Sequence, residues 1–312
     1  MMDKLAVIIP VFGEKELVSI LYNRLKNVLA TLPVESEIIY VNDACPFGSG
    51  EELAKIAESD DSVTLINLSR NFGETNAVKA GIDNCFADYA VVMDCDLQDL
   101  PEDIPLLYNK AKEGYDVVWG ERVKRDDNFF KKFSSDSFYF FANLFSEIKI
   151  NKKIGSFSVI SKKVIKELQK INDYSFSFIQ NVEYLGFKKA YVPVTKSERP
   201  KGKSAYNFVK SMTLALKILV STSDKPLLIP VISSFILFLL CFLGCITFMI
   251  FVAAKIDVQN ILFLGFCLFI LLLFAILFLN IGIIGIYTGI ILKETLSKPR
   301  YVIEKKLAKK DD

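Results

Sequence analysis

Apolar and polar positions alternate along the first 120 residues in a way that predicts the fold. Short apolar runs predict buried strands, and the stretches between them carry apolar residues at helical spacing. The predicted strands are Leu5–Pro10, Glu37–Val41, Val63–Leu68, Tyr89–Met93 and Asp116–Trp119. The predicted helices are Glu14–Leu32, Gly50–Glu58, Thr75–Cys85 and Glu102–Glu113. This alternation predicts an α/β domain with a mostly parallel sheet covered by helices on both faces, in which ligands bind beyond the carboxyl ends of the strands.

Two later stretches are rich in apolar and basic residues and are predicted to lie in a membrane interface. Residues 128–150 contain many phenylalanines together with Lys131 and Lys132, and residues 207–220 carry Lys210 and Lys217. Such amphipathic composition is typical of interfacial helices. The alternative for residues 128–150 is a helix of the protein core.

The C-terminal third of the chain predicts two transmembrane helices. Leu227–Ala254 and Ile261–Leu292 contain no charged residue, and each exceeds the roughly 20 residues needed to cross a bilayer. Basic residues flank both ends of the pair, so the positive-inside rule places both ends in the cytosol. We therefore expect a cytosolic catalytic domain over residues 1–225, a transmembrane hairpin over 226–292 and a basic cytosolic tail over 293–312. The alternative is a helical hairpin buried in a soluble protein.

The amino-acid composition excludes several kinds of catalytic and metal site. The 312-residue chain has no histidine, which excludes Ser-His-Asp and Cys-His catalysis and every histidine-ligated metal site. The six cysteines show no paired spacing and indicate free thiols in a reducing compartment. The formal net charge is only +2, so we expect no nucleic acid partner. No signal peptide is expected before the first strand, so the domain should stay in the cytosol, at a bacterial inner membrane.

The strongest chemical signal follows the fourth predicted strand. Asp94 and Asp96 are separated by one residue, and Gln98 and Asp99 come directly after them. Hard oxygen ligands of this kind suit Mg²⁺ or Mn²⁺, which can bridge a substrate diphosphate. A solvated acidic turn is the alternative for the motif alone, but its place after a strand favours a site.

Polar residues after other strands point to a phosphate-rich ligand. Asp43 follows the second strand, where a carboxylate can bind a nucleotide base or ribose, although a turn or helix cap is the alternative. Arg70 follows the third strand and Arg122 the fifth. The basic loop Arg199–Tyr206 contains a glycine. Arginines bind phosphate oxygens bidentately, and three at such places favour a phosphate site over isolated surface charges.

In this order, the motifs resemble those of the family 2 inverting glycosyltransferases with a GT-A fold. They are most similar to the dolichyl- and undecaprenyl-phosphate sugar transferases, which include dolichol-phosphate mannose synthase. The resemblance covers essentially the whole chain. The matching runs are Val7–Pro10, Val41–Asp43, Leu68–Gly73, Asp94–Pro101, Arg199–Tyr206, Gly285–Tyr287 and Lys298–Ile303.

The resemblance implies a role for each candidate residue. Pro10, Glu14, Asp43, Arg70 and Asp94 would bind the nucleotide-sugar. Asp94, Asp96 and Gln98 would surround the Mg²⁺ or Mn²⁺ ion. Arg122 and Arg199 would act with the two aspartates in catalysis, and Arg199, Lys203, Ser204 and Tyr206 would bind the lipid phosphate. The implied reaction transfers a hexose from a UDP- or GDP-sugar to a polyprenyl phosphate at the cytosolic membrane face, with inversion; a homo-oligomer is possible.

The chain departs from the family pattern at a position that bears on the acceptor. A Gly-Asp-Phe-Arg run of relatives, whose aspartate is a candidate base, reads Gly155–Ser158 here, so Ser156 stands in place of the carboxylate. A sugar hydroxyl needs a general base, whereas a phosphate monoester with a second pKa of about 6 is already anionic. The missing carboxylate therefore favours a lipid phosphate, although Ser158 removes an arginine that could bind it.

Three further departures are Gly13, Asn42 and Phe47, which replace an asparagine and two aspartates of the family pattern.

Two alternative functions stay open. One is transfer to a hydroxyl of a lipid-linked saccharide, with Asp173 or Glu183 as the base. The other is a catalytically inactive membrane scaffold, against which the intact Asp94, Asp96 and Arg199 argue.

Overall fold

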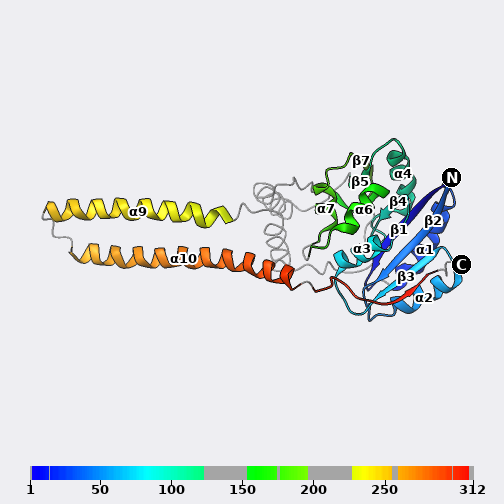
Figure 1. Ribbon diagram of the computed structural model, residues 1–312, viewed down its shortest axis with the longest axis horizontal. Coiled ribbons are helices and arrows are strands. Elements are labelled where there is room, and N and C mark those ends of the chain that lie inside the picture. The colour runs from blue at the N-terminus through cyan, green and yellow to red at the C-terminus, as the bar shows by residue number, and fades with distance from the viewer. Residues whose placement is uncertain are drawn as a thin grey trace. The chain divides into compact units, whose positions relative to one another are not determined.

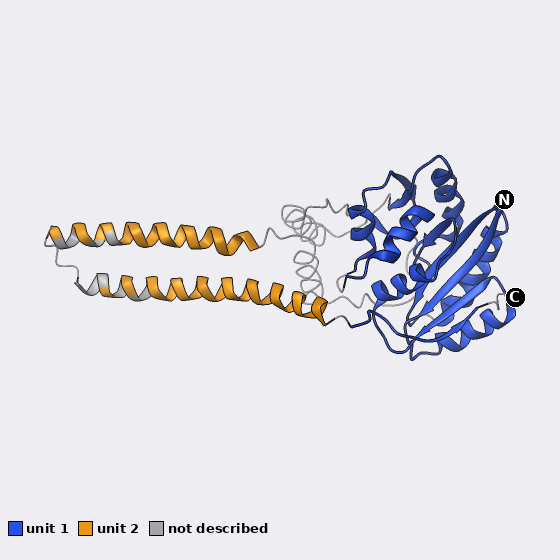
Figure 2. Ribbon diagram, viewed as in Figure 1, with its two compact units in different colours: residues 1–139, 148–205, 298–312 blue, residues 140–147, 206–297 orange. Residues whose placement is uncertain are grey.

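The computed structural model describes residues 2–13, 15–122, 153–173, 176–195, 227–254, 259–296 and 298–308. The chain divides into two compact units (Figure 2). The first unit holds residues 1–139, 148–205 and 298–312, and the second holds residues 140–147 and 206–297. The C-terminal residues therefore belong to the first unit, although they follow the second in the sequence.

One eight-stranded sheet organises the first unit (Figure 1). Its strands, in spatial order, are β7 (Lys189–Val194), β5 (Val117–Arg122), β6 (Ile154–Ser161), β4 (Tyr89–Val92), β1 (Asp3–Val11), β2 (Val34–Asn42), β3 (Val63–Leu68) and β8 (Ile303–Leu307). The four strands β4, β1, β2 and β3 pair in parallel, as the sequence predicts. β7 also pairs in parallel with β5, whereas β6 and β8 run antiparallel to their neighbours. The sheet is therefore mixed, and the prediction of a mostly parallel sheet is confirmed. The regular alternation of strands and helices stops at β5, and β6 and β8 lie beyond it.

Helices cover both faces of the sheet because alternate strand residues point to opposite sides. Leu5, Val7 and Ile9 of β1 pack in one core, and Ala6 and Ile8 pack in the other. The first core is closed by α1 (Lys15–Leu29), α2 (Ser49–Ser59) and α4 (Ile104–Lys112), which follows the short 3-10 helix η1 (Pro101–Asp103). The second is closed by α3 (Glu74–Asp83), α6 (Lys162–Lys170) and α7 (Phe178–Tyr184). The four helices predicted in this region are thus confirmed, with ends shifted by a few residues.

Helix α3 lies unusually close to the sheet at a glycine. A Cβ atom at Gly81 would come within 2.3 Å of Ile8 Cγ2 on β1. Real side chains do not approach so closely, so the helix can pack on β1 in this way only with glycine at this position. The contact places the N-terminal end of α3 beside the ends of the central strands.

The C-terminal segment adds an edge strand that the sequence analysis did not predict. It expected a basic tail over 293–312, and β8 forms within that range. Leu307 pairs opposite Leu65 of β3, and Ile303 pairs opposite Leu68. Both β8 residues pack against buried residues of the first unit. This pairing covers the outer edge of β3.

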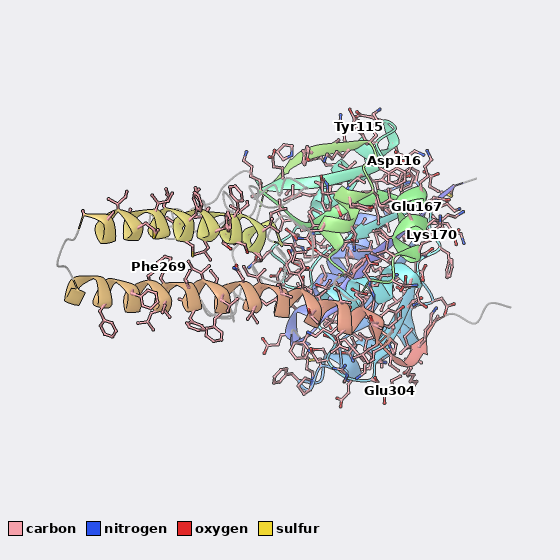
Figure 3. The ribbon with its side chains drawn as sticks, turned by 60° about the vertical axis from the view of Figure 1, so that its left-hand side comes forward. Tyr115, Asp116, Glu167, Lys170, Phe269 and Glu304 are labelled. Atoms are coloured by element: carbon pink, nitrogen blue, oxygen red, sulfur yellow. The ribbon has the colours of Figure 1, made fainter. Side chains whose placement is uncertain are left out.

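The second unit contains α9 (Leu228–Ala253) and α10 (Gln259–Thr295), whose side chains stand out along both helices in Figure 3. Ser233 of α9 and Asn280 of α10 are joined by hydrogen bonds of 2.9 and 3.1 Å. Large apolar side chains are exposed, such as Phe235 at 70% and Phe278 at 67%. Over the described residues, Phe269–Thr295 is long and apolar enough to cross a membrane, and Leu228–Gly244 is a shorter apolar helix. One of the two predicted spans is therefore supported by length and composition, and the two-helix transmembrane hairpin stays a prediction.

The interfacial helices predicted over 128–150 and 207–220 lie outside the described residues.

Candidate active site

The carboxyl ends of the parallel strands surround a hollow of about 210 Å³ in the first unit. Parallel strands end at the same edge of a sheet, so residues that are far apart in the chain meet there. The lining residues come from the ends of β1, β2, β3 and β4 and from the first turns of α3. They are Pro10, Val11, Phe12, Asp43, Asn71, Gly73, Glu74, Ala77, Asp94, Cys95 and Asp96. The structure thus brings Pro10, Asp43, Asp94 and Asp96 of the predicted set to one cavity.

Asp43 organises the loop that follows β3. Its side chain is buried, and its two carboxylate oxygens accept the backbone N–H groups of Phe72 at 2.6 Å and Gly73 at 2.8 Å. Burial raises the pKa of Asp43, while the two amide hydrogen bonds and the charge of Arg70 oppose the rise. The carboxylate therefore anchors the loop that carries Asn71 and Gly73 into the cavity wall, besides lining the cavity itself.

Asn42 and Cys45 connect the loops after β1 and β2. Asn42 donates to Asn67 Oδ1 on β3 at 2.8 Å and accepts the backbone N–H of Cys45 at 3.1 Å. The Cys45 sulfur accepts the backbone N–H groups of Gly13 at 3.1 Å and Phe47 at 3.4 Å. Asn42, which replaces an aspartate of the family pattern, is therefore part of a neutral hydrogen-bonded network that fixes both loops.

The Asp94–Asp99 turn places two carboxylates at the cavity. Leu97 has a φ of +57°, in the left-handed region, and Asp96 Oδ1 accepts the backbone N–H of Gln98 at 3.0 Å. Asp94 and Asp96 both line the cavity, and the turn between them carries the chain past the end of β4. Gln98 is not among the residues that line the cavity.

Negative charge is concentrated around Asp94. Burial, and then the charges of Glu74, Asp99 and Asp96, raise the pKa of Asp94 to about 7. Ser156 of β6 donates its hydroxyl to Asp94 Oδ1 at 3.1 Å, which opposes the rise. A site with this much negative charge favours a cation.

The donor set fits a hard divalent ion. Asp94 and Asp96 offer carboxylate oxygens, the ligands that Mg²⁺ and Mn²⁺ prefer. Mg²⁺ is commonly held by one or two carboxylates together with water and substrate phosphates, so two carboxylates suffice. Within the described ranges, no group of three or more His, Cys, Asp or Glu side chains is placed to hold a metal ion.

The other predicted residues are placed as follows. Arg70 packs over the Phe72 ring at 4.1 Å and donates to the Asn71 carbonyl at 3.3 Å, so it lies beside the cavity rather than in its wall. Arg122 is the last residue of β5, at the same edge of the sheet, and its side chain is not described. Glu14 and the run that contains Arg199, Lys203, Ser204 and Tyr206 lie outside the described residues.

The sequence analysis missed Glu74, which lines the cavity from the first turn of α3. It named Ser156 but did not predict that its hydroxyl reaches Asp94 from β6. Glu74 directly follows the matched run that ends at Gly73, so its position before a predicted helix could have identified it. The contact of Ser156 depends on the antiparallel pairing of β6 with β4, which no local pattern indicates.

The two alternative bases differ in their surroundings. Glu183 accepts the Trp119 indole N–H at 2.9 Å and forms an ion pair with Lys189. Its small cavity includes Val117, the first residue of β5, and therefore lies toward the amino end of that strand, opposite to the candidate site. Asp173 is exposed after α6. Glu183 is therefore unsuited to act as a base at the Asp94 cavity.

Comparison with known proteins gives the same family as the motifs. The model of glycosyl transferase family 2 matches residues 6–169. The bactoprenol glucosyl transferase of Shigella phage SfX is 29% identical over 309 residues, covering 96% of this chain and 99% of the phage protein. The undecaprenyl-phosphate 4-deoxy-4-formamido-L-arabinose transferase of Photorhabdus laumondii is 30% identical over 311 residues, covering 97% and 94%. Mannosyl-3-phosphoglycerate synthase from Rubrobacter xylanophilus is similar in fold alone, with a TM-score of 0.53 over 70% of this chain and 73% of that chain at 12% identity.

Proposed function

The chain belongs to glycosyl transferase family 2, and from that premise we propose that it transfers a sugar from a nucleotide-sugar to a polyprenyl phosphate. The observation that carries the proposal is the cavity at the carboxyl ends of β1, β2 and β4, lined by Pro10, Asp43, Asp94 and Asp96. Relatives named for bactoprenol and for undecaprenyl phosphate cover almost the whole chain. They support a polyprenyl phosphate acceptor.

In this proposal the cavity binds the donor. Asp43 and the loop it anchors, with Asn71 and Gly73, form the nucleotide side. Asp94 and Asp96 would hold a Mg²⁺ or Mn²⁺ ion, which offsets the negative charge that develops on a departing nucleoside diphosphate. The raised pKa of Asp94 supports cation binding, since a cation relieves the repulsion among the neighbouring carboxylates. In this proposal the donor is a nucleotide-sugar whose nucleotide is either UDP or GDP.

The acceptor step in this proposal needs no general base. A polyprenyl phosphate is ionised near neutral pH, because the second pKa of a phosphate monoester is about 6. Its oxygen attacks the anomeric carbon from the side opposite the diphosphate, the bond to the diphosphate breaks, and the configuration inverts. Ser156, which stands where relatives have a candidate base, donates a hydrogen bond to Asp94. The Glu183 carboxylate contacts Trp119 and Lys189 and lies away from the site. Both contacts favour an acceptor that is already anionic.

Arg122, Arg199, Lys203, Ser204 and Tyr206 are proposed to bind the phosphates of donor and acceptor. Arg122 ends β5 at the edge of the sheet where the cavity lies. The charge and hydrogen-bonding capacity of these side chains suit phosphate oxygens.

We place the catalytic domain on the cytosolic face of a bacterial inner membrane, with α9 and α10 as a transmembrane hairpin and both ends of the chain in the cytosol. Phe269–Thr295 supports one span, and the exposed apolar side chains of α9 support the second. The basic residues after α10 support the orientation.

A panel of nucleotide-sugars, supplied to membranes containing the protein and undecaprenyl phosphate, tests the proposal. Mass spectrometry of the lipid fraction should show one lipid-phosphate sugar, formed only with a divalent ion. A sugar appearing instead on a lipid-linked saccharide, with loss of turnover in Asp173→Asn, would establish the hydroxyl acceptor. No nucleotide-sugar binding with Mg²⁺ or Mn²⁺ present would establish the inactive scaffold.

A further inference from the structure

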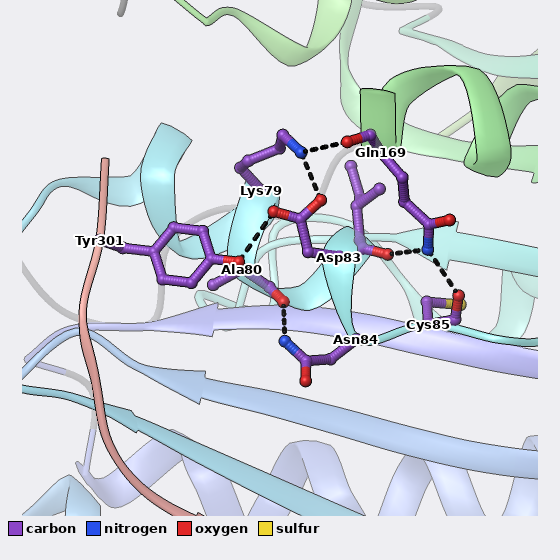
Figure 4. Close-up of polar contacts among 8 residues, drawn as sticks. Lys79, Ala80, Asp83, Asn84, Cys85, Gln169 and Tyr301 are labelled. Atoms are coloured by element: carbon purple, nitrogen blue, oxygen red, sulfur yellow. Dashed lines mark hydrogen bonds and ion pairs between the residues drawn. The ribbon is translucent and has the colours of Figure 1, made fainter. Parts of the chain in front are cut away.

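A cluster of polar side chains joins helix α3 to the C-terminal segment (Figure 4). The Tyr301 hydroxyl donates to Asp83 Oδ2 at 2.8 Å, and Lys79 pairs with the other carboxylate oxygen of Asp83. Lys79 also donates to the carbonyl oxygen of Gln169 in α6 at 3.3 Å. We call Lys79, Asp83 and Tyr301 the tail latch.

Burial of the Lys79 ammonium group fixes the arrangement of the tail latch. The Lys79 side chain is only 1% exposed, and burial lowers its pKa, while the Asp83 carboxylate opposes that shift. A buried ammonium group without a partner is very costly, so Asp83 must stay beside Lys79. The second oxygen of Asp83 is thereby held in place as an acceptor. Burial and the bond to Asp83 raise the pKa of Tyr301, so its hydroxyl remains a donor.

Further contacts make the end of α3 a firm anchor. Gln169 donates to the carbonyl oxygens of Ile82 at 2.9 Å and Cys85 at 3.0 Å, which satisfies backbone groups at the end of the helix. Lys306 on β8 adds a second link to the tail by donating to Asn84 Oδ1 at 3.1 Å. The opposite end of α3 contributes Glu74 and Ala77 to the active-site cavity. The helix that holds the tail is therefore also a wall of the site.

The tail latch lies a short distance along the chain from the apolar helix. Tyr301 follows Thr295, the last residue of α10, by only six positions, so the tail latch comes directly after the apolar helix in the sequence. The pairing of β8 with β3 by itself binds the tail only weakly to the first unit. Glu304, Lys305 and Lys306 are exposed, and the strand pairs on one side only. Short edge elements with little buried area open easily.

We propose that the tail latch positions the catalytic domain for the lipid acceptor. By holding Tyr301 on α3, it keeps the chain leaving α10 close to the wall of the active site, so that a phosphate at the membrane surface can reach the donor. The proposal rests on the proposed function, because it assigns the acceptor to the membrane. Tyr301 and Asp83 are positioning residues in this role, and neither lines the donor cavity.

Hydrogen exchange tests the structural half of the proposal on the full-length protein in lipid nanodiscs. Tyr301→Phe removes only the hydroxyl, and amides in residues 298–308 should exchange faster by on the order of tenfold, because a hydrogen bond to a carboxylate is lost. Tyr22→Phe is the matched control: the Tyr22 hydroxyl donates to Asp60 at 2.8 Å, and Asp60 pairs with Lys26 at 2.8 Å, far from the tail in sequence. It should leave exchange in 298–308 unchanged. Equal exchange in Tyr301→Phe and the wild type would overturn the latch.

Enzyme kinetics test whether the tail latch positions the domain for the lipid acceptor. Tyr301→Ala, which also removes the packed ring, should raise KM for undecaprenyl phosphate several-fold. It should leave unchanged the KM for the nucleotide-sugar and the rate of nucleotide-sugar hydrolysis by water. Tyr22→Ala should change none of these three quantities. A raised donor KM, or an unchanged acceptor KM with faster tail exchange, would refute the positioning role. If the wild type makes no lipid product, the proposed function itself fails, and hydrogen exchange still decides whether the latch holds the tail.

Discussion

Replacing Asp94 with asparagine should stabilise the metal-free catalytic domain at alkaline pH while removing its activity. Asparagine has nearly the same shape and carries no charge. Its amide oxygen can still accept the Ser156 hydroxyl, which lies 3.1 Å from Asp94 Oδ1. The substitution therefore removes mainly a charge that burial disfavours and that Glu74, Asp99 and Asp96 repel.

The size of the effect follows from the pKa of Asp94, which rises from 3.8 to about 7 in the folded protein. A carboxyl group whose pKa is raised by folding lowers the stability as the pH rises, because the folded state holds its proton longer than the unfolded state does. The stability is unaffected below the unfolded pKa and falls until the pH passes the folded pKa. Each pKa unit corresponds to about 1.4 kcal/mol, so the loss above pH 7 amounts to at most about 4 kcal/mol. Partial exposure of Asp94 to solvent makes the expected gain in Asp94→Asn smaller than this ceiling.

The single tryptophan provides the assay. Trp119 is fully buried in β5, so its fluorescence reports unfolding of the catalytic domain without a signal from the apolar helices. Urea unfolding of the full-length protein in detergent with EDTA should give a higher free energy of unfolding for Asp94→Asn than for the wild type at pH 8. The difference should shrink toward zero as the pH falls toward 4.

A control of opposite sign comes from Asp60. Hydrogen bonds from Lys26, Ser62 and Tyr22 hold the pKa of Asp60 below its usual range despite burial. Asp60→Asn should therefore lower the free energy of unfolding at pH 8. If Asp94→Asn is no more stable than the wild type at pH 8 in EDTA, the inferred cost of holding the Asp94 charge, buried and among other carboxylates, is wrong, and with it the electrostatic argument for a cation.

Three further predictions concern the site, the fold and the membrane. Asp96→Ala should reduce metal-dependent transfer by about a hundredfold or more, measured as lipid-linked sugar by mass spectrometry; full retained activity would remove Asp96 from the metal site. Gly81→Ala should lower the free energy of unfolding by about 1–3 kcal/mol, since its Cβ would lie 2.3 Å from Ile8 Cγ2; an unchanged Trp119 unfolding curve would show that α3 can move away from β1. Replacing residues 227–297 with a flexible linker should weaken membrane association and impair use of long-chain lipid acceptors, and unchanged membrane association and lipid turnover would count against the anchoring role. Keeping residues 298–312 preserves β8, which a simple truncation at residue 226 would remove.

Much of the candidate site could be predicted because it depends on local sequence and one general rule. Apolar runs of strand length identified β1, β2, β3 and β4, and parallel strands end at a common edge. Polar residues directly after these strands were therefore good candidates. The structure places Asp43, Asp94 and Asp96 around one cavity.

The sequence by itself determined the central strands, the helices between them, the apolar C-terminal segment and the family, because each depends on short-range periodicity or on an ordered set of short motifs. Only the tertiary structure decided what those residues touch. The bond from Ser156 to Asp94 spans 62 positions and depends on an antiparallel pairing. The bond from Tyr301 to Asp83 spans 218 positions and crosses the whole second unit in sequence. Contacts at such separations are selected by the packing of the entire domain, which no local pattern along the chain records.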